Sequence, residues 1–126
     1  MAQKKNAVGW FEIPVANMKR SMAFYESAFG YKLDKPIEMM GFEMSFFPMD
    51  STAAGASGSL IRGEGYTPSH EGALVYFSVD NIEETEIKIV KNKGKVYKPK
   101  FSIGQHGFIS ICEDAEGNRI ALHSMN

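Results

Sequence analysis

The chain has 126 residues, a length typical of one domain, with 44% hydrophobic and 23% charged residues. Its formal net charge of −1 argues against a nucleic-acid-binding surface across the domain, and its single cysteine, Cys112, excludes an intrachain disulfide and a cysteine-rich zinc site. No apolar run is long enough to span a membrane, and no apolar segment of a signal peptide follows the basic N-terminus. We therefore expect a cytoplasmic protein with no nucleic-acid or membrane partner.

Two segments, residues 10–33 and 74–97, align as a weak internal repeat. Each begins with the period-2 alternation of a half-buried strand and continues, after an Asn at the N-cap position (Asn17 and Asn81), with helical spacing of apolar residues. Gly30 and Gly94 stand where a left-handed C-cap is expected. The helix residues that we expect to be buried are Met18, Met22, Tyr25 and Phe29 in the first copy, and Ile82, Thr85, Ile89 and Val90 in the second.

Strand-like runs complete each copy. Residues 42–47 and 108–113 form comparable runs, and residues 58–62 are matched with residues 117–121 as short final strands. Residues 51–58 are rich in Gly, Ala and Ser and predict a mobile loop. We therefore predict one domain over residues 1–126, with two consecutive β-α-β-β-β modules at about residues 7–63 and 73–125 and a linker at about 64–72.

Two motifs resemble those of the glyoxalase/bleomycin-resistance/extradiol-dioxygenase superfamily, also called vicinal oxygen chelate. They are V-A-N-M-K-R-S-M-A-F-Y-E-S-A-F-G at residues 15–30 and E-D-A-E-G-N-R-I at residues 113–120, which is similar to the family's near-terminal D-P-D-G-N turn. The resemblance covers nearly the whole chain. It implies an α+β fold in which two tandem βαβββ modules form a curled, cup-like mixed sheet around a small-molecule site, and it implies a homodimer. Members are typically metalloenzymes that bind two neighbouring substrate oxygens on a divalent metal, but non-catalytic binders share the fold.

The resemblance also locates the family's four metal-ligand positions. They fall on Trp10 and Leu74 in the first strands of the two modules, and on Arg62 and Ala121 in the last strands. Transition metals take imidazole, carboxylate or thiolate ligands, and an Arg side chain stays protonated. No cofactor is therefore expected at the usual position, which argues against a standard glyoxalase I or extradiol dioxygenase.

Every second residue of a strand shares a face, so these four positions imply others that face the cup. The predicted cup is an aromatic floor with one acid, one cation, one phenol and one imidazole: Trp10, Glu12, Arg62, Tyr76 and His123. A few convergent polar groups in an apolar pocket are typical of a ligand site. We predict Glu12, Tyr76 and His123 as catalytic residues, and Trp10, Arg62, His106, Leu74 and Ala121 as substrate-binding residues.

Each of these residues also has a structural interpretation. Glu12 is either a general base tuned by burial or the ion-pair partner of Arg62 or Arg119. Arg62 could clamp a carboxylate or phosphate, or reach solvent at the end of a strand. Tyr76 could donate to a substrate oxygen, or be a half-buried strand aromatic.

The histidines leave the same choice open. His123 could act as an acid or base near neutral pH, or bond to a neighbour in the terminal strand. His106 lies between glycines in G-Q-H-G-F, where it either approaches a ligand or forms a turn. His70 is interpreted as a loop residue, and Cys112 as a buried small hydrophobe.

Three functions are consistent with the sequence. The first is a metal-independent isomerase or lyase that transfers a proton next to a carbonyl of a small hydrophobic or carboxylated compound, with Glu12 as the base and Arg62 or Tyr76 stabilising the oxyanion. The second is a non-catalytic protein that binds or sequesters a small molecule. The third is a divalent-metal lyase or dioxygenase with a displaced site that uses some of Glu12, His106 and His123.

Overall fold

The structure is a computed structural model that describes residues 6–126. The first module contains β1 (Phe11–Pro14), α1 (Met18–Phe29), β2 (Ile37–Met39), β3 (Phe42–Phe46) and β4 (Gly58–Arg62). The second contains β5 (Val75–Ser78), α2 (Ile82–Lys91), β6 (Lys95–Ser102), the 3-10 turn η1 (Gly104–His106), β7 (Phe108–Glu113) and β8 (Arg119–Ser124).

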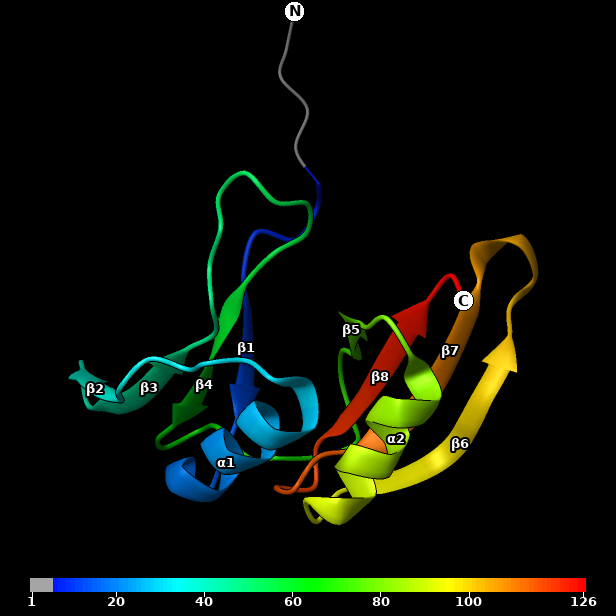
Figure 1. The fold of residues 1–126 in the computed structure, drawn as a ribbon. Helices are drawn as coiled ribbons and strands as arrows, with labels where there is room; N and C mark the ends of the chain where they lie inside the picture. The colour runs from blue at the N-terminus through cyan, green and yellow to red at the C-terminus, as the bar shows by residue number, and fades with distance from the viewer. Residues whose placement is uncertain (1–5) are drawn as a thin grey trace, which may run out of the picture.

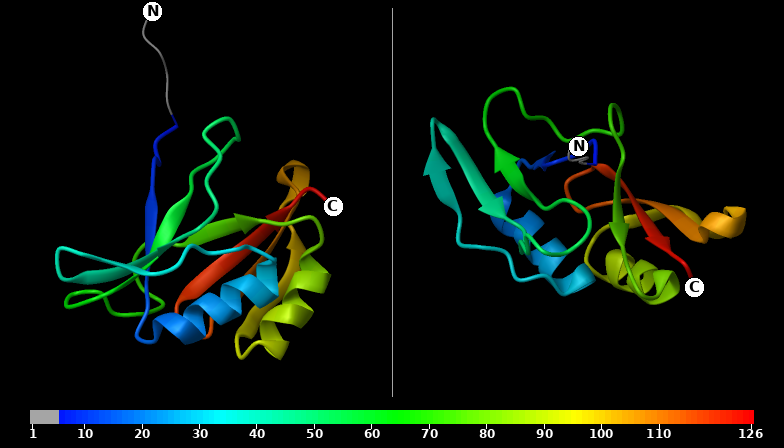
Figure 2. Two further views of the ribbon diagram at one scale, coloured as in Figure 1. Left: turned by 60° about the vertical axis from the view of Figure 1, so that its left-hand side comes forward. Right: turned by 90° about the horizontal axis from the view of Figure 1, so that it is seen from above.

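Each module forms its own four-stranded mixed sheet, with strand order β1-β4-β3-β2 in the first and β5-β8-β7-β6 in the second (Figure 1). The first and last strands of each module are parallel neighbours, and the other pairs are antiparallel. Helix α1 packs against β3 and β4, and α2 packs against β6, β7 and β8 (Figure 2). The predicted α+β fold of two tandem βαβββ modules is confirmed, as two open four-stranded sheets.

Both helices begin at the predicted caps. The side chain of Asn17 accepts a hydrogen bond from the amide of Arg20 at 2.9 Å, and Asn81 does the same for Glu84 at 2.9 Å. The predicted buried face of α2 is wrong at Val90, which is 58% exposed. Ile82, Thr85 and Ile89 are buried at spacings of three and four residues, and the residue after Ile89 is turned about 100° away from them.

The helix C-termini differ. Gly30 is left-handed with φ 79°, as predicted, but the prediction for Gly94 is wrong, because the left-handed residue is Lys93 with φ 78°. Gly94 is required for another reason. A Cβ on it would lie 2.6 Å from the carbonyl oxygen of Glu113 and 2.8 Å from Cε1 of Phe24.

An aromatic core joins the two modules. Phe77 of β5 packs among rings of the first module, with centroid distances of 4.9 Å to Phe29, 5.6 Å to Tyr25 and 6.1 Å to Phe11. Tyr25 is fully buried, and its hydroxyl donates to Oδ2 of Asp114 at 2.6 Å. The core therefore lies on the helix side of both sheets. We use the name cup face for the opposite side of each sheet.

The near-terminal turn after β7 also connects the modules. Glu116 accepts hydrogen bonds from the backbone amides of Ala16 and Asn17, each at 2.8 Å, and from Nε of Arg20 at 2.5 Å. Asn118 donates from Nδ2 to the carbonyl oxygen of Pro14 at 2.7 Å. The turn of the second module thus fixes both the end of β1 and the beginning of α1 in the first.

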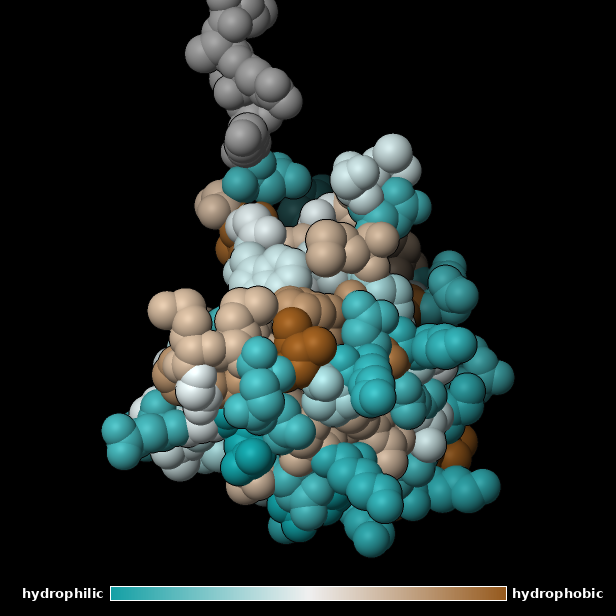
Figure 3. Space-filling view, turned by 90° about the vertical axis from the view of Figure 1, so that its left-hand side faces the viewer, coloured by the Kyte–Doolittle hydropathy of each residue, from teal (hydrophilic) through white to brown (hydrophobic). Residues whose placement is uncertain are grey.

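Apolar side chains also lie on the surface. Figure 3 shows brown and tan side chains beside one another on the side of the molecule that carries β2 and β3. Ile37, Met39 and Met40 are 41%, 44% and 91% exposed there. Among the described residues, no helix is long and apolar enough to cross a membrane.

Candidate functional site

Within the described residues, a pocket of about 1010 Å³ is lined by residues of the first strands of the two modules. Its walls come from residues that alternate along β1 and β5 and just before them. Their neighbours Ile13 and Phe77 are buried in the aromatic core, which is the alternation expected for two strands with one face on a core. The alternating residues that line the pocket are Trp10, Glu12, Pro14, Leu74, Tyr76 and Ser78.

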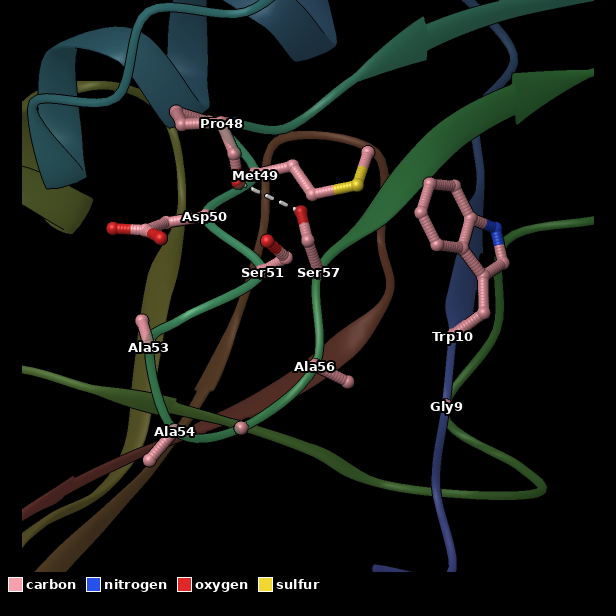
Figure 4. Close-up of a pocket in the computed structure, with 11 residues that line it drawn as sticks. Gly9, Trp10, Pro48, Met49, Asp50, Ser51, Ala53, Ala54, Ala56 and Ser57 are labelled. Atoms are coloured by element: carbon pink, nitrogen blue, oxygen red, sulfur yellow. Dashed lines mark hydrogen bonds between the residues drawn. The ribbon is translucent and has the colours of Figure 1, made fainter. Parts of the chain in front are cut away.

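A smaller pocket of about 400 Å³ adjoins the first and shares Trp10 with it. Its other wall is the loop at residues 48–57 between β3 and β4. Figure 4 shows the side chain of Met49 extending from this loop toward the indole of Trp10. The hydroxyl of Ser57 donates to the carbonyl oxygen of Pro48 at 2.8 Å and ties the two ends of the loop together. The segment predicted as a mobile loop therefore forms a wall of the site.

Glu12 lines the large pocket from the middle of β1 and is exposed. Among the described residues it forms no ion pair, so the alternative in which Arg62 or Arg119 neutralises it is wrong. Its neighbour is Tyr66 in the linker, whose pKa is raised chiefly by the negative charge of the Glu12 carboxylate. Because Glu12 is exposed, the burial assumed for a base at this position is absent.

Four of the predicted site residues meet at this pocket: Trp10, Glu12, Leu74 and Tyr76. Trp10 and Tyr76 are 39% and 49% exposed, so both rings offer free apolar surface. Ala121 is fully buried on β8 and pairs with Tyr76 in the parallel register of β5 and β8. It lies next to the pocket wall without lining the pocket.

Arg62 does not line the pocket. Its Nε donates to Oε1 of Glu43 at 2.9 Å, and these two residues are paired across β3 and β4. In β4, Arg62 is two residues from the fully buried Leu60, so it shares the helix side of the sheet. The prediction that Arg62 faces the cup is therefore wrong.

His106 and His123 lie together at the end of the second sheet. Nε2 of His123 is 2.7 Å from the carbonyl oxygen of His106, which agrees with the structural interpretation of His123. Neither residue lines either pocket. Among residues 6–126, no three His, Cys, Asp or Glu side chains form a group that could hold a metal ion, so Glu12 is not brought to the two histidines.

The strand register corrects the metal-ligand positions implied by the family resemblance. Ala121 pairs with Tyr76 on β5, and the residue that pairs with Glu12 on β1 is Ser59, not Arg62. Ser59 is fully buried, and within the described chain its hydroxyl has no hydrogen-bond partner. The corrected positions are Trp10, Ser59, Leu74 and Ala121, which supply no imidazole, carboxylate or thiolate. These residues do not fit the divalent metal that the family typically uses.

One cluster of polar side chains, around Glu113 in β7, was not predicted from the sequence. Oε1 of Glu113 lies 2.5 Å from Nε2 of His70 and accepts a hydrogen bond from the hydroxyl of Tyr97 at 2.9 Å. Burial favours the neutral acid, but these two hydrogen bonds outweigh it and hold the pKa of Glu113 below its usual value. The cluster holds the linker against the second sheet. No sequence pattern indicated it, because His70 lies in a segment without periodicity.

Comparison with known proteins places the chain in a family. The sequence model of the "Glyoxalase/Bleomycin resistance protein/Dioxygenase superfamily" matches residues 7–122. A "Glyoxylase-like domain-containing protein" of Didymella fabae is 28% identical over 123 residues, which cover 91% of each chain. CFP32 of Mycobacterium tuberculosis, a candidate glyoxylase, is 26% identical over an alignment that covers 98% of this chain and 47% of the relative. The chain thus spans about half the length of this curated relative.

Solved structures support the same fold. A glyoxylase/bleomycin resistance protein/dioxygenase domain from Frankia sp. EAN1pec superposes with a TM-score of 0.75 over 96% of this chain and 98% of that one, at 15% sequence identity. At this identity the similarity concerns the arrangement of helices and strands.

Proposed function

The chain belongs to the glyoxalase/bleomycin resistance protein/dioxygenase superfamily, and we propose that it binds a small molecule in the pocket between β1 and β5 without a divalent metal. One observation carries this proposal: the four metal positions hold Trp10, Ser59, Leu74 and Ala121, while two of them, Trp10 and Leu74, line an aromatic pocket of about 1010 Å³. A concave apolar pocket with a few polar groups is the usual form of a small-molecule site.

Binding would be driven by the aromatic walls. Trp10 and Tyr76 are 39% and 49% exposed. A ligand that covers apolar surface gains about 25 cal/mol of binding free energy per Å². Tyr31, Phe47 and Phe77 also line the pocket and connect it to the core. The packing of these core rings against one another keeps the binding surface in shape before a ligand arrives.

The test is a ligand screen that uses Trp10 as the reporter. Trp10 is the only tryptophan of the chain, so its fluorescence reports on the pocket directly. We expect saturable fluorescence changes with compounds that also raise Tm, and recovery of each compound unchanged by mass spectrometry. Replacing Tyr76 with Ala should weaken binding about tenfold. The control, Ile87→Ala on the exposed side of α2, should have no effect. Equal affinities of the two variants would contradict the proposal.

Catalysis by Glu12 is the second candidate. Its carboxylate lines the pocket together with Tyr76, and its negative charge raises the pKa of the nearby Tyr66. In an isomerase or lyase reaction, Glu12 would accept a proton from the carbon next to a carbonyl, and a tyrosine hydroxyl would donate to the oxygen on which negative charge develops. This candidate predicts a product by mass spectrometry that Glu12→Gln abolishes while binding is retained. Product formation that is unchanged in this variant would eliminate Glu12 as the base.

We further propose that the protein is a cytoplasmic homodimer. The exposed apolar residues Ile37, Met39 and Met40 favour contact with a second copy, because large exposed apolar patches are uncommon on monomers. Light scattering after size exclusion should give twice the chain mass of 14.0 kDa. A mass of one chain at all concentrations would contradict the dimer.

A further inference from the structure

The charged residues that line the two pockets are all acidic within the described chain. Glu12 and Glu71 line the large pocket, and Asp50 lines the small one. Among residues 6–126, no Lys, Arg or His lines either pocket. Arg62, the cation that the sequence analysis placed in the cup, is bound to Glu43 elsewhere. The two pockets share Trp10, Pro48 and residues 54–57, so Asp50 lies near the large pocket, which Glu12 and Glu71 line directly.

The three acids that line the pockets form no ion pair within the described chain. Within residues 6–126, no basic side chain lies within the 4.0 Å of an ion pair from Glu12, Glu71 or Asp50. Four acids outside the pockets are paired: Glu116 with Arg20, Glu43 with Arg62, Glu113 with His70 and Glu83 with Lys100. The pocket carboxylates therefore lack a counter-charge from the described protein.

Two contacts support a negative charge in the pockets. Oδ1 of Asp50 accepts hydrogen bonds from the hydroxyl and the amide of Thr52 at 2.6 and 2.9 Å, and they hold the pKa of Asp50 below its usual value. Asp50 is thus ionised at neutral pH. The field of the Glu12 carboxylate raises the pKa of the nearby Tyr66, which lies outside the residues that line the two pockets. An anionic ligand would meet this field as repulsion.

The exposed rings beside these carboxylates suit a cation. Trp10 lines both pockets, and its ring is held edge-on by Phe46 at a centroid distance of 5.8 Å. Tyr76 of β5 also lines the large pocket. Ammonium groups bind to the faces of Trp and Tyr rings, and a carboxylate nearby adds Coulomb attraction.

Resting on the proposed function, we infer that the ligand of this pocket is cationic: an ammonium group, protonated or quaternary, on an apolar body. The carboxylates of Glu12 and Glu71 supply the counter-charge and the rings of Trp10 and Tyr76 the apolar contact. This inference replaces the carboxylated compound considered from the sequence.

Three probes of matched shape test the charge preference: choline (cationic), 3,3-dimethylbutan-1-ol (neutral) and 3,3-dimethylbutanoate (anionic). Binding is followed by Trp10 fluorescence and by calorimetry. We expect choline to bind at least about tenfold more tightly than the neutral alcohol, the anion to bind most weakly, and added salt to weaken choline binding. Glu12→Gln and Glu71→Gln should each weaken choline binding by about threefold or more.

The control is Glu84→Gln, which removes the same charge from the exposed side of α2 and should leave choline binding unchanged. Neutral alcohol binding as tightly as choline, or Gln variants that bind choline like the wild type, would overturn the cationic ligand while the proposed small-molecule site remains. Absence of choline binding at 50 mM to the folded protein would also overturn it. A fluorescence and Tm screen that includes neutral compounds tests the site itself, separately from the charge preference.

Discussion

Asp114 and Glu116 lie two residues apart in one turn, and their pKa values move in opposite directions. Burial raises the pKa of Asp114, although Tyr25 and backbone amides donate to it. Burial has the same sign for Glu116, but hydrogen bonds from Arg20 and two amides outweigh it and lower the pKa. The near-terminal turn therefore holds Glu116 as an ionised carboxylate that anchors the other module.

Replacing Glu116 with Gln should lower the free energy of unfolding by about 1–3 kcal/mol at pH 7, because three donors lose a charged acceptor. The folded pKa lies below the usual value of 4.5, so Glu116 stabilises the fold above pH 4.5 and loses this effect as the pH falls through its folded pKa. The difference between wild type and variant should shrink below pH 4.5.

Urea unfolding at pH 7 and at pH 3.5 measures this difference. Glu64→Gln, at an exposed turn position outside both helices, is the control and should match the wild type at both pH values. A Glu116→Gln penalty that does not change with pH would show that the carboxylate charge is unimportant.

At the residue scale, the sequence predicted the part of the site that depends on strand alternation. Trp10, Glu12 and Tyr76 follow a clear period of two, and they line the pocket. Arg62 was misplaced because residues 58–61 are all buried and show no alternation from which a face could be read. Glu71, which also lines the pocket, could not be predicted, since the linker has no periodicity.

At the element scale, the helices show which signals are reliable. Asn17 and Asn81 cap their helices as predicted, because an N-cap side chain acts on amides only two or three residues away. The predicted position of the left-handed residue at the end of α2 was wrong by one residue. Lys93 takes the left-handed conformation and Gly94 makes the close approach to β7. The second role depends on tertiary packing, which a local pattern does not contain.

Because Lys93 takes the left-handed conformation and Gly94 makes the close approach, substitutions at these two positions should have opposite effects on the free energy of unfolding. Gly94→Ala should lower the free energy of unfolding by about 1–3 kcal/mol, because the new Cβ would overlap Glu113 and Phe24. Lys93→Gly should leave it unchanged or raise it by up to about 1 kcal/mol, because Gly adopts positive φ without strain. Chemical unfolding of the two variants measures both values. If Lys93→Gly lowered the free energy of unfolding more than Gly94→Ala, the roles assigned to these two residues would be wrong.

At the scale of the whole molecule, the pocket results from how the two modules meet. Phe77 enters the aromatic core of the first module, and the turn at Glu116 and Asn118 holds the end of β1. These contacts bring residues of β1 and β5 to the lining of one pocket. The internal repeat predicted two modules, but their relative position depends on contacts between residues about 100 positions apart.

The proposed function requires that this pocket bind its ligand without the divalent metal typical of the superfamily. The most direct test is metal analysis of protein purified without a metal-affinity step, together with Tm in the presence and absence of Zn, Ni, Mn, Fe and Mg. We predict less than stoichiometric metal and no rise in Tm, because Trp10, Ser59, Leu74 and Ala121 provide no suitable ligands. Near-stoichiometric metal with a clear rise in Tm would contradict it.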